Sequence, residues 1–373
     1  MSAPVELVRA SPLVRVIGAA VRASGRLSTL RHRRPRSSAV QVAHALPMVI
    51  SEVTAEAVDV VSVRLAGFDG APLPAWSPGE HIDLVLPSGR VRQYSLCGDP
   101  SDRSGYRIAV RRLPDGGGGS LEVHTLSTGD RVTIRGPRQA FPLLTAPRYL
   151  FLAGGIGITA ILPMVRAAAA AGLDWRLVYV GRDRASMPFL DELAELAERA
   201  GLAGLAGPAG PAGFGDRLLI RTDDEHDGPA TGAELLGYAP APGSVGYCCG
   251  PPPMLASVRA AMRAAGPGCV LDVLHAERFA PPAVLGGGEL TVELARSGGS
   301  LTVPSDRSVL EVVRDRLPDV AYSCRQGFCG TCKVRVITGE VEHRDHVLAP
   351  HERADTMTIC VSRAIGDRLV LDL

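Results

Sequence analysis

The sequence predicts a multidomain chain in which an antiparallel β-barrel, a parallel α/β sheet and a small α+β unit follow one another. Three patterns predict this: short strands between turn residues, then a strand–helix alternation, then a tight group of cysteines. The chain has 373 residues, of which 46% are apolar, enough for several cores. Charged residues make up 21% and the formal net charge is +1, so neither global disorder nor nucleic-acid binding is expected.

Residues 1–44 are expected to form a basic N-terminal extension. Arginine is abundant here and Glu6 is the only acid. The apolar residues between Leu7 and Val21 are spaced as on one face of a helix, and a basic run follows at residues 31–36. A flexible solvated tail is one interpretation. A helix that docks on a partner or a membrane surface, or a transit peptide, are the others.

Residues 45–145 show the pattern of a barrel. Short runs rich in β-branched residues alternate with turn signals such as Pro78-Gly79 and Ser88-Gly89. Many short strands with regular turns suggest a closed barrel. The predicted strands are 58–65, 81–86, 106–111 and 131–135.

Residues 146–280 alternate between strand and helix patterns. This alternation indicates a parallel sheet with crossover helices. The first element is a buried strand at 149–153, which a glycine turn and a helix follow. Further expected elements are a strand at 176–180, a helix at 187–200, a strand that ends at 247–249 and a helix at 254–265, with a loop at 202–215.

Residues 281–287 are expected to form a linker, because they are rich in Pro and Gly. A compact unit at 288–373 completes the chain. The eight cysteines do not suggest a disulfide framework, since so large a chain does not need one. Clustered cysteines more often bind a metal, so a reducing cytoplasm is the expected location. No run of about 18 apolar residues is present, and no transmembrane segment is expected.

The strongest chemical signal is the spacing of four cysteines. Cys324, Cys329 and Cys332 follow a C-x4-C-x2-C pattern, and Cys360 lies further on in a strand-like run, 358–362. This is the plant-type [2Fe-2S] spacing, in which four thiolates hold two irons. Small residues in the loop would let backbone N–H groups face the sulfurs. A structural zinc site is the alternative, but it prefers CxxC pairs.

A second signal is Arg92-Gln93-Tyr94-Ser95, a pattern typical of flavin-binding barrels. Tyr94 can pack on the flavin ring, the Ser95 hydroxyl can reach the ring nitrogen that receives hydride, and Arg92 can pair with the phosphate. The alternative is an edge strand with a buried tyrosine. A glycine-rich turn before a helix supports the flavin, because its N–H groups can cradle a phosphate. The turn is Gly116-Gly117-Gly118-Gly119-Ser120.

A third signal is a pair of turns, each between a strand and a helix. The first contains Gly154, Gly155, Gly157 and Thr159, and the second begins at Cys249-Gly250. A dinucleotide pyrophosphate needs a glycine loop that opens a helix. Because both strands are expected to be parallel, the two turns should lie side by side at the carboxyl edge of the sheet.

These motifs, in this order, resemble the phthalate dioxygenase reductase family within the ferredoxin–NADP reductase superfamily, over residues 46–373. The resemblance implies an FMN-binding barrel, a nicotinamide-binding α/β domain and a β-grasp-like [2Fe-2S] ferredoxin domain. It implies FMN rather than FAD. The residues that it assigns to the flavin are Arg92, Tyr94, Ser95, Ala109, Val110, Arg111, Gly118, Gly119, Ser120 and Thr159.

The resemblance also implies which residues lie nearest the hydride transfer. Gly155 and Cys249 would lie near the nicotinamide, and Phe279 would close that domain against the flavin. Ser95, Cys249 and Phe279 are therefore the expected catalytic residues. Choice between NADH and NADPH stays open, because residues 181–186 hold Asp183 as well as Arg182, Arg184 and Ser186; the resemblance favours NADH.

The expected function is electron transfer from NAD(P)H through FMN to the cluster, and then to a separate oxygenase. A flavin is needed because the nicotinamide delivers two electrons at once and the cluster accepts one at a time. The acceptor would be a Rieske oxygenase or a haem-thiolate monooxygenase, and the reductase is expected to be a monomer. The alternatives are a self-contained flavin reductase acting on a small oxidant, and a non-catalytic redox sensor.

Overall fold

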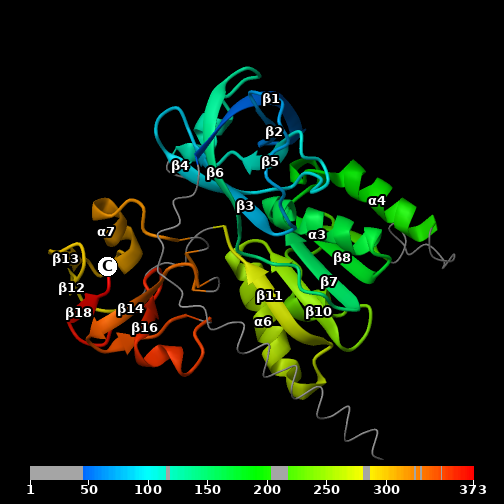
Figure 1. The fold of residues 1–373 in the computed structure, drawn as a ribbon. Coiled ribbons are helices and arrows are strands. Elements are labelled where there is room, and N and C mark those ends of the chain that lie inside the picture. The colour runs from blue at the N-terminus through cyan, green and yellow to red at the C-terminus, as the bar shows by residue number, and fades with distance from the viewer. Residues whose placement is uncertain are drawn as a thin grey trace, which may run out of the picture. The chain divides into compact units, whose positions relative to one another are not determined.

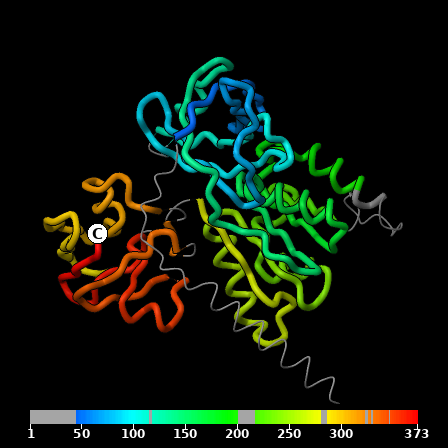
Figure 2. The backbone as a smooth tube through the Cα atoms, viewed as in Figure 1, coloured from blue at the N-terminus to red at the C-terminus, as the bar shows by residue number. Residues whose placement is uncertain are grey.

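A computed structural model describes residues 45–114, 118–202, 217–279, 286–322, 325–327, 330–345 and 347–373 (Figures 1 and 2). The expected basic extension, most of the predicted loop at 202–215, most of the linker, and the predicted cluster ligands Cys324 and Cys329 lie outside these residues. In the part of the chain that is described, no helix is both long and apolar enough to cross a membrane.

The first sheet is antiparallel and has the order β4-β3-β6-β1-β2-β5. Just beyond β4, Cys97 N donates to Arg107 O of the opposite edge strand at 2.9 Å, so the sheet is a partly closed barrel. Alternate residues such as Val63 and Leu65 point into its core. Its strands are β1 (Ala45–Ala57), β2 (Val60–Gly67), β3 (Glu80–Val85), β4 (Val91–Ser95), β5 (Tyr106–Arg111) and β6 (Arg131–Gln139), with α2 (Gly119–Val123) between the last two.

The four predicted strands of this sheet are present, with one shifted start. The strand expected from Val58 begins at Val60, because Asp59 has a φ of +59° and forms the turn of a hairpin. Strand β1 was not predicted. Few of its residues are buried, and its pairing with β2 shifts register after Ile50 and after Ala55, so it lacks a regular alternation.

The second sheet is parallel throughout, with the order β11-β10-β7-β8-β9. Its strands are β7 (Arg148–Gly154), β8 (Asp174–Gly181), β9 (Leu218–Thr222), β10 (Ser244–Cys249) and β11 (Leu271–Glu277). The helices between them are α3 (Ile158–Ala170), α4 (Leu190–Leu202), α5 (Gly232–Leu236) and α6 (Pro252–Ala265). The predicted parallel sheet is confirmed.

Three details of this sheet differ from the prediction. The helix expected from Met187 begins at Leu190, because Phe189 has a φ of +66° and a short 3-10 turn, Arg184–Ser186, precedes it. The edge strands β9 and β11 were not predicted, since both are short and β11 alternates poorly between apolar and polar residues.

The third sheet has the order β13-β12-β18-β14-β16 and packs on α7 (Val309–Arg316). A capping box begins this helix, with Ser308 and Glu311 each bonding to the backbone of the other. The strands are β12 (Leu290–Leu294), β13 (Ser300–Val303), β14 (Lys333–Thr338), β16 (Thr356–Thr358) and β18 (Arg368–Leu371), and β15 (Val341–Glu342) pairs separately with β17 (Arg363–Ala364).

The strand-like run predicted at 358–362 is wrong. Strand β16 ends at Thr358, whose carbonyl accepts hydrogen bonds from Val361 N (3.3 Å) and Ser362 N (3.1 Å). Cys360 therefore lies in a turn. Its apolar neighbours Ile359 and Val361 give the sequence the pattern of a strand. A turn that packs on the core contains apolar residues just as a buried strand does, so the pattern does not distinguish the two.

Candidate functional site

A cradle for a phosphate lies at the start of α2. Gly118 precedes this helix with a φ of +78°, and no side chain caps its N-terminus. The Arg92 side chain lies against the next residue: a Cβ at Gly119 would come within 2.5 Å of Arg92 Nε. An anion here would accept hydrogen bonds from backbone N–H groups and from a guanidinium. The residues fit the phosphate of FMN.

The other predicted flavin residues of the barrel have structural partners of their own. The Ser120 hydroxyl accepts from Leu113 N (3.0 Å) and donates to Leu113 O (3.2 Å), so its backbone N–H is the group left to face a phosphate. Ala109 and Val110 are buried in β5. Arg111 donates to Ser186 O (2.6 Å) and so links the barrel to the second sheet.

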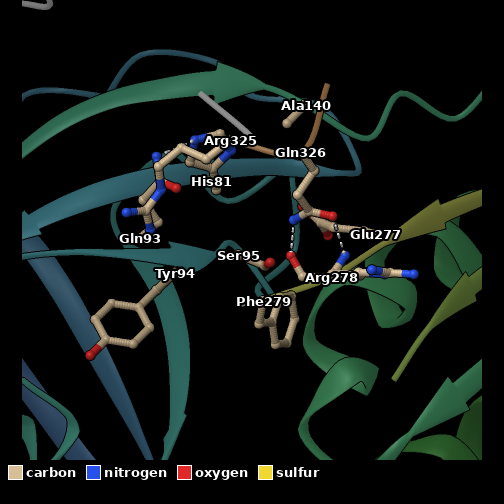
Figure 3. Close-up of a pocket in the computed structure, with 10 residues that line it drawn as sticks. All are labelled: His81, Gln93, Tyr94, Ser95, Ala140, Glu277, Arg278, Phe279, Arg325 and Gln326. Carbon is tan, nitrogen blue, oxygen red and sulfur yellow. Dashed lines mark hydrogen bonds between the residues drawn. The ribbon is translucent and has the colours of Figure 1, made fainter. Parts of the chain in front are cut away.

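A pocket opens beside the end of β4 (Figure 3). The empty space inside it, open solvent included, is about 390 Å³. Ser95 and Phe279 lie close together in it, whereas the Tyr94 ring points away from them. Phe279 is 47% exposed, so its ring offers a free apolar face. Burial raises the pKa of Tyr94 to about 12, which keeps its phenol neutral.

The carboxyl group of Glu277 lies in the wall of this pocket, at the end of β11. Its Oε2 atom is buried and has no hydrogen-bond partner. Burial raises the Glu277 pKa to about 8, so the side chain is largely protonated at neutral pH and can donate a hydrogen bond. An unpartnered buried donor next to Ser95 and Phe279 fits a polar atom of a bound ring.

The register of the parallel sheet pairs Cys249 with Glu277. Burial, with a smaller contribution from the Glu277 carboxylate, raises the Cys249 pKa well above its ordinary value. The side chain is therefore a neutral thiol and a poor nucleophile. This suits a packing role next to a bound nicotinamide rather than covalent chemistry.

The two glycine turns lie side by side, as predicted. Strands β7 and β10 pair in parallel, with Cys249 opposite Ala153. A Cβ at Gly157 would come within 2.2 Å of Cys249 O, and one at Gly154 within 2.7 Å of the Pro251 ring. The N-terminus of α3 has no side-chain cap, so its N–H groups fit a pyrophosphate.

Thr159 supports the first turn from within. Its hydroxyl donates to Ile156 O at 3.0 Å, and the residue is buried. Gly155 has a φ of +52°, and a Cβ there would lie 3.8 Å from the Arg111 guanidinium. Tyr179 donates from its hydroxyl to Gly155 O (3.1 Å). The turn is thus held from both sheets.

The loop after β8 settles how its charges pair. The Asp183 carboxylate accepts a hydrogen bond from Ser186 N (2.8 Å). Arg184 forms an ion pair with Glu225 (2.8 Å), a residue of the loop that follows β9. The positive charge that could attract a 2′-phosphate therefore has a carboxylate beside it.

Two of the four predicted cluster ligands lie among the described residues. Cys332 precedes β14 and Cys360 follows β16, and both are buried. Pairing of these strands brings them together, since Ile359 N donates to Cys332 O at 3.2 Å. Before Cys332, Gly327 and Gly330 have φ values of +76° and +70°, and a Cβ at Gly327 would meet Val361 Cγ2 at 2.8 Å. The two buried thiols fit ligands of a small iron-sulfur cluster.

Three residues of the site were not assigned from the sequence. Glu277 lies in the stretch His275–Phe279, but nothing in the sequence shows that its carboxyl is buried. Glu225 belongs to a loop far from Arg184 in sequence. Gln326, between two predicted cluster ligands, is polar and yet only 7% exposed.

Known proteins resemble this chain over most of its length. The family model for a 2Fe-2S iron-sulfur cluster binding domain matches residues 292–364. Phthalate dioxygenase reductase from Burkholderia cepacia is 36% identical over 322 residues, which are 84% of this chain and 93% of that protein. A solved structure of phthalate dioxygenase reductase has a TM-score of 0.63 and 35% identity, and the match covers 90% of this chain and 99% of that one.

Two further relatives extend the comparison. The reductase subunit of tert-butanol monooxygenase / tert-amyl alcohol desaturase from Aquincola tertiaricarbonis is 35% identical over 349 residues, 88% of this chain and 96% of the relative. An intact type IV self-sufficient cytochrome P450 monooxygenase has a TM-score of 0.68 and 36% identity. That match covers 94% of this chain but only 44% of the P450 chain.

Proposed function

The chain belongs to the phthalate dioxygenase reductase family, and from this premise we propose that it carries electrons from a nicotinamide dinucleotide to a partner oxygenase. One observation carries the proposal. The pocket that contains Ser95 of the barrel and Phe279 of the parallel sheet is also lined by Gln326 of the cluster-binding unit. A donor, a flavin and a cluster can therefore meet at one place.

The three sheets divide the work. Residues 45–145 bind FMN, residues 146–280 bind NAD(P)H, and residues 288–373 are the plant-type ferredoxin domain, joined through the linker 281–287. FMN bound by residues 45–145 would supply the conversion of a two-electron hydride into single electrons for the cluster. Cys324, Cys329, Cys332 and Cys360 are the cluster ligands.

The side chains of the pocket position the reacting groups. Arg92 and the first turn of α2 hold the FMN phosphate, and the first turn of α3 holds the pyrophosphate of the nicotinamide. Ser95 and protonated Glu277 would donate hydrogen bonds towards the bound rings, and the exposed Phe279 ring would offer the flavin an apolar face. The Cys249 thiol packs next to the nicotinamide.

NADH is the preferred donor. Arg184, one of two arginines in the loop after β8 that could attract a 2′-phosphate, is neutralised by Glu225. Asp183, Asp223 and Asp224 add negative charge at the ends of the same two strands, β8 and β9. Steady-state kinetics with both donors test this preference. A higher kcat/KM with NADPH contradicts it.

The partner is a separate oxygenase, either a Rieske oxygenase or a haem-thiolate monooxygenase. Within one polypeptide, the self-sufficient P450 joins a region like this chain to a monooxygenase, which supports the second partner class. The reductase works in the cytoplasm, in keeping with the thiols Cys97, Cys248, Cys249 and Cys269, which form no disulfide among the described residues.

The cluster ligands provide the decisive test. Cys329→Ser should leave the rate of flavin reduction by NADH unchanged, because the cluster lies downstream. It should abolish electron delivery to a haem-protein acceptor such as cytochrome c. Rapid mixing followed by absorbance, together with flavin and iron analysis of the wild type, makes the measurement. Loss of flavin reduction in the folded variant, or FAD or zinc in the wild type, would falsify the proposal.

A further inference from the structure

A pair of hydrogen bonds connects the cluster-binding loop to the end of β11 (Figure 3). Arg278 N donates to the side-chain carbonyl of Gln326 at 3.1 Å, and the Gln326 side-chain amide donates back to Arg278 O. A single side chain thus pairs with both polar groups of one residue, as a neighbouring strand would. Gln326 is only 7% exposed, so water competes weakly for these bonds.

The two residues belong to parts of the chain with different cores. Gln326 lies between Cys324 and Cys329, in a unit whose apolar residues form a hydrophobic core of their own. Arg278 lies between Glu277 and Phe279, at the end of a sheet that shares an apolar cluster with the barrel. Arg138 of the barrel also lies over the Tyr322 ring of the third unit, at 5.7 Å. Specific contacts therefore hold the cluster-binding unit in place.

We propose that Gln326 is a positioning residue for electron transfer: its two hydrogen bonds to Arg278 fix the distance between the flavin and the cluster. The inference rests on the proposed function and deepens it. Each transfer moves one electron from the reduced flavin to the oxidised cluster, and no bond of the protein forms or breaks. The rate of such tunnelling falls steeply with distance. Hydride transfer to the flavin does not involve these two hydrogen bonds.

Two variants separate hydrogen bonding from packing. Gln326→Met keeps the length of the side chain but can neither donate nor accept, and Gln326→Ala removes the side chain as well. In both, rapid mixing with NADH resolves flavin reduction from the later reduction of the cluster. Subsequent reduction of the cluster should be slower by about tenfold, equivalent to about 1.4 kcal/mol in the docking equilibrium.

Two readouts do not depend on turnover. Hydrogen exchange at the Arg278 amide should be faster in both variants, because Gln326 no longer accepts its proton. The midpoint potential and the electron paramagnetic resonance spectrum of the dithionite-reduced cluster should match those of the wild type. A Gln326 that only shaped the cluster site would alter the potential or the spectrum, and such a change overturns the inference.

Gln139→Ala is the matched control. Its side chain also spans two backbone groups, donating to Pro78 O (3.1 Å) and accepting from Phe141 N (3.0 Å), but within the barrel. This variant should reduce its cluster at the wild-type rate. The Gln326–Arg278 hydrogen bonds do not position the cluster if Gln326→Met also reduces its cluster at the wild-type rate. The same conclusion follows if the Arg278 amide of that variant stays protected from hydrogen exchange. A wild-type protein whose cluster NADH never reduces contradicts the proposed function instead.

Discussion

At the residue scale, Arg92 can lie across the start of α2 because position 119 has no side chain. A glycine in this place therefore does two things. It exposes the backbone N–H groups of the first helical turn, and it leaves room for the guanidinium beside them. A phosphate at this position would meet a charged partner and neutral donors from the same side.

We expect Arg92→Ala to weaken FMN binding by about 1.5–3 kcal/mol, the contribution of a charge-assisted hydrogen bond. Fluorescence titration of the flavin-free protein with FMN measures the change. Arg64→Ala is the control, because it removes a barrel arginine whose partner is Asp102 (2.6 Å). Equal affinity of the Arg92 variant and the wild type would show that Arg92 does not contact the phosphate.

Glu277 makes stability depend on pH. Burial raises its folded pKa from the ordinary value of 4.5 to about 8, so folding favours the neutral form. The stabilisation is complete below pH 4.5 and is lost as pH rises through about 8. We expect the melting temperature of the wild type to fall between pH 5 and pH 9 relative to Glu277→Gln, which cannot ionise. Parallel melting curves for the two proteins would contradict this assignment.

At the scale of elements, the nicotinamide site depends on how closely two turns approach. Gly157 has an ordinary helical φ of −59°, so backbone strain does not require glycine there. The close contact with Cys249 requires glycine, since the Cβ of any other residue would lie 2.2 Å from Cys249 O. The start of α3 and the end of β10 would have to separate, and the pyrophosphate site between them would widen.

We expect Gly157→Ala to lower the stability by about 1–3 kcal/mol, as overpacking does, and to raise the KM for NADH. Thermal unfolding and steady-state kinetics measure the two effects. Gly268→Ala is the control, because Gly268 has open space around it and no positive φ. A Gly157 variant that matches this control would show that the turns can separate without cost.

At the scale of the whole molecule, the barrel and the parallel sheet share one apolar cluster. Val60, Cys97 and Ala109 of the barrel pack with residues of β7 and α3. Glu192 of α4 reinforces this contact. Its carboxylate pairs with Arg107 of the barrel (2.8 Å) and also with Arg166 of α3. The barrel and the parallel sheet are therefore built as one body.

We expect Glu192→Gln to destabilise both sheets together by about 1–3 kcal/mol, because two half-buried arginines lose their shared carboxylate. Urea unfolding followed by tryptophan fluorescence reports on both, through Trp76 of the barrel and Trp175 of the parallel sheet. Glu195→Gln is the control on the same helix, since its ion pair with Arg199 is exposed. Unfolding in two separate steps would contradict a shared core.

By itself, the sequence determined the class and order of the three units. The cysteine spacing, the two glycine turns, Arg92-Gln93-Tyr94-Ser95 and the strand–helix alternation are all local, and a local pattern records the geometry that neighbouring residues must adopt. Strand β1 was not predicted, because its local pattern is weak. The strand predicted around Cys360 was wrong, because a buried turn has the apolar residues of a strand.

Only the tertiary structure decided the contacts between distant residues. It paired Arg184 with Glu225, buried the Glu277 carboxyl beside the Cys249 thiol, and placed Gln326 against Arg278. A charge, a pKa or a hydrogen bond depends on what lies within a few ångströms in space. Residues far apart in the chain become neighbours only when the sheets form and pack, so no spacing rule along the sequence can reveal them.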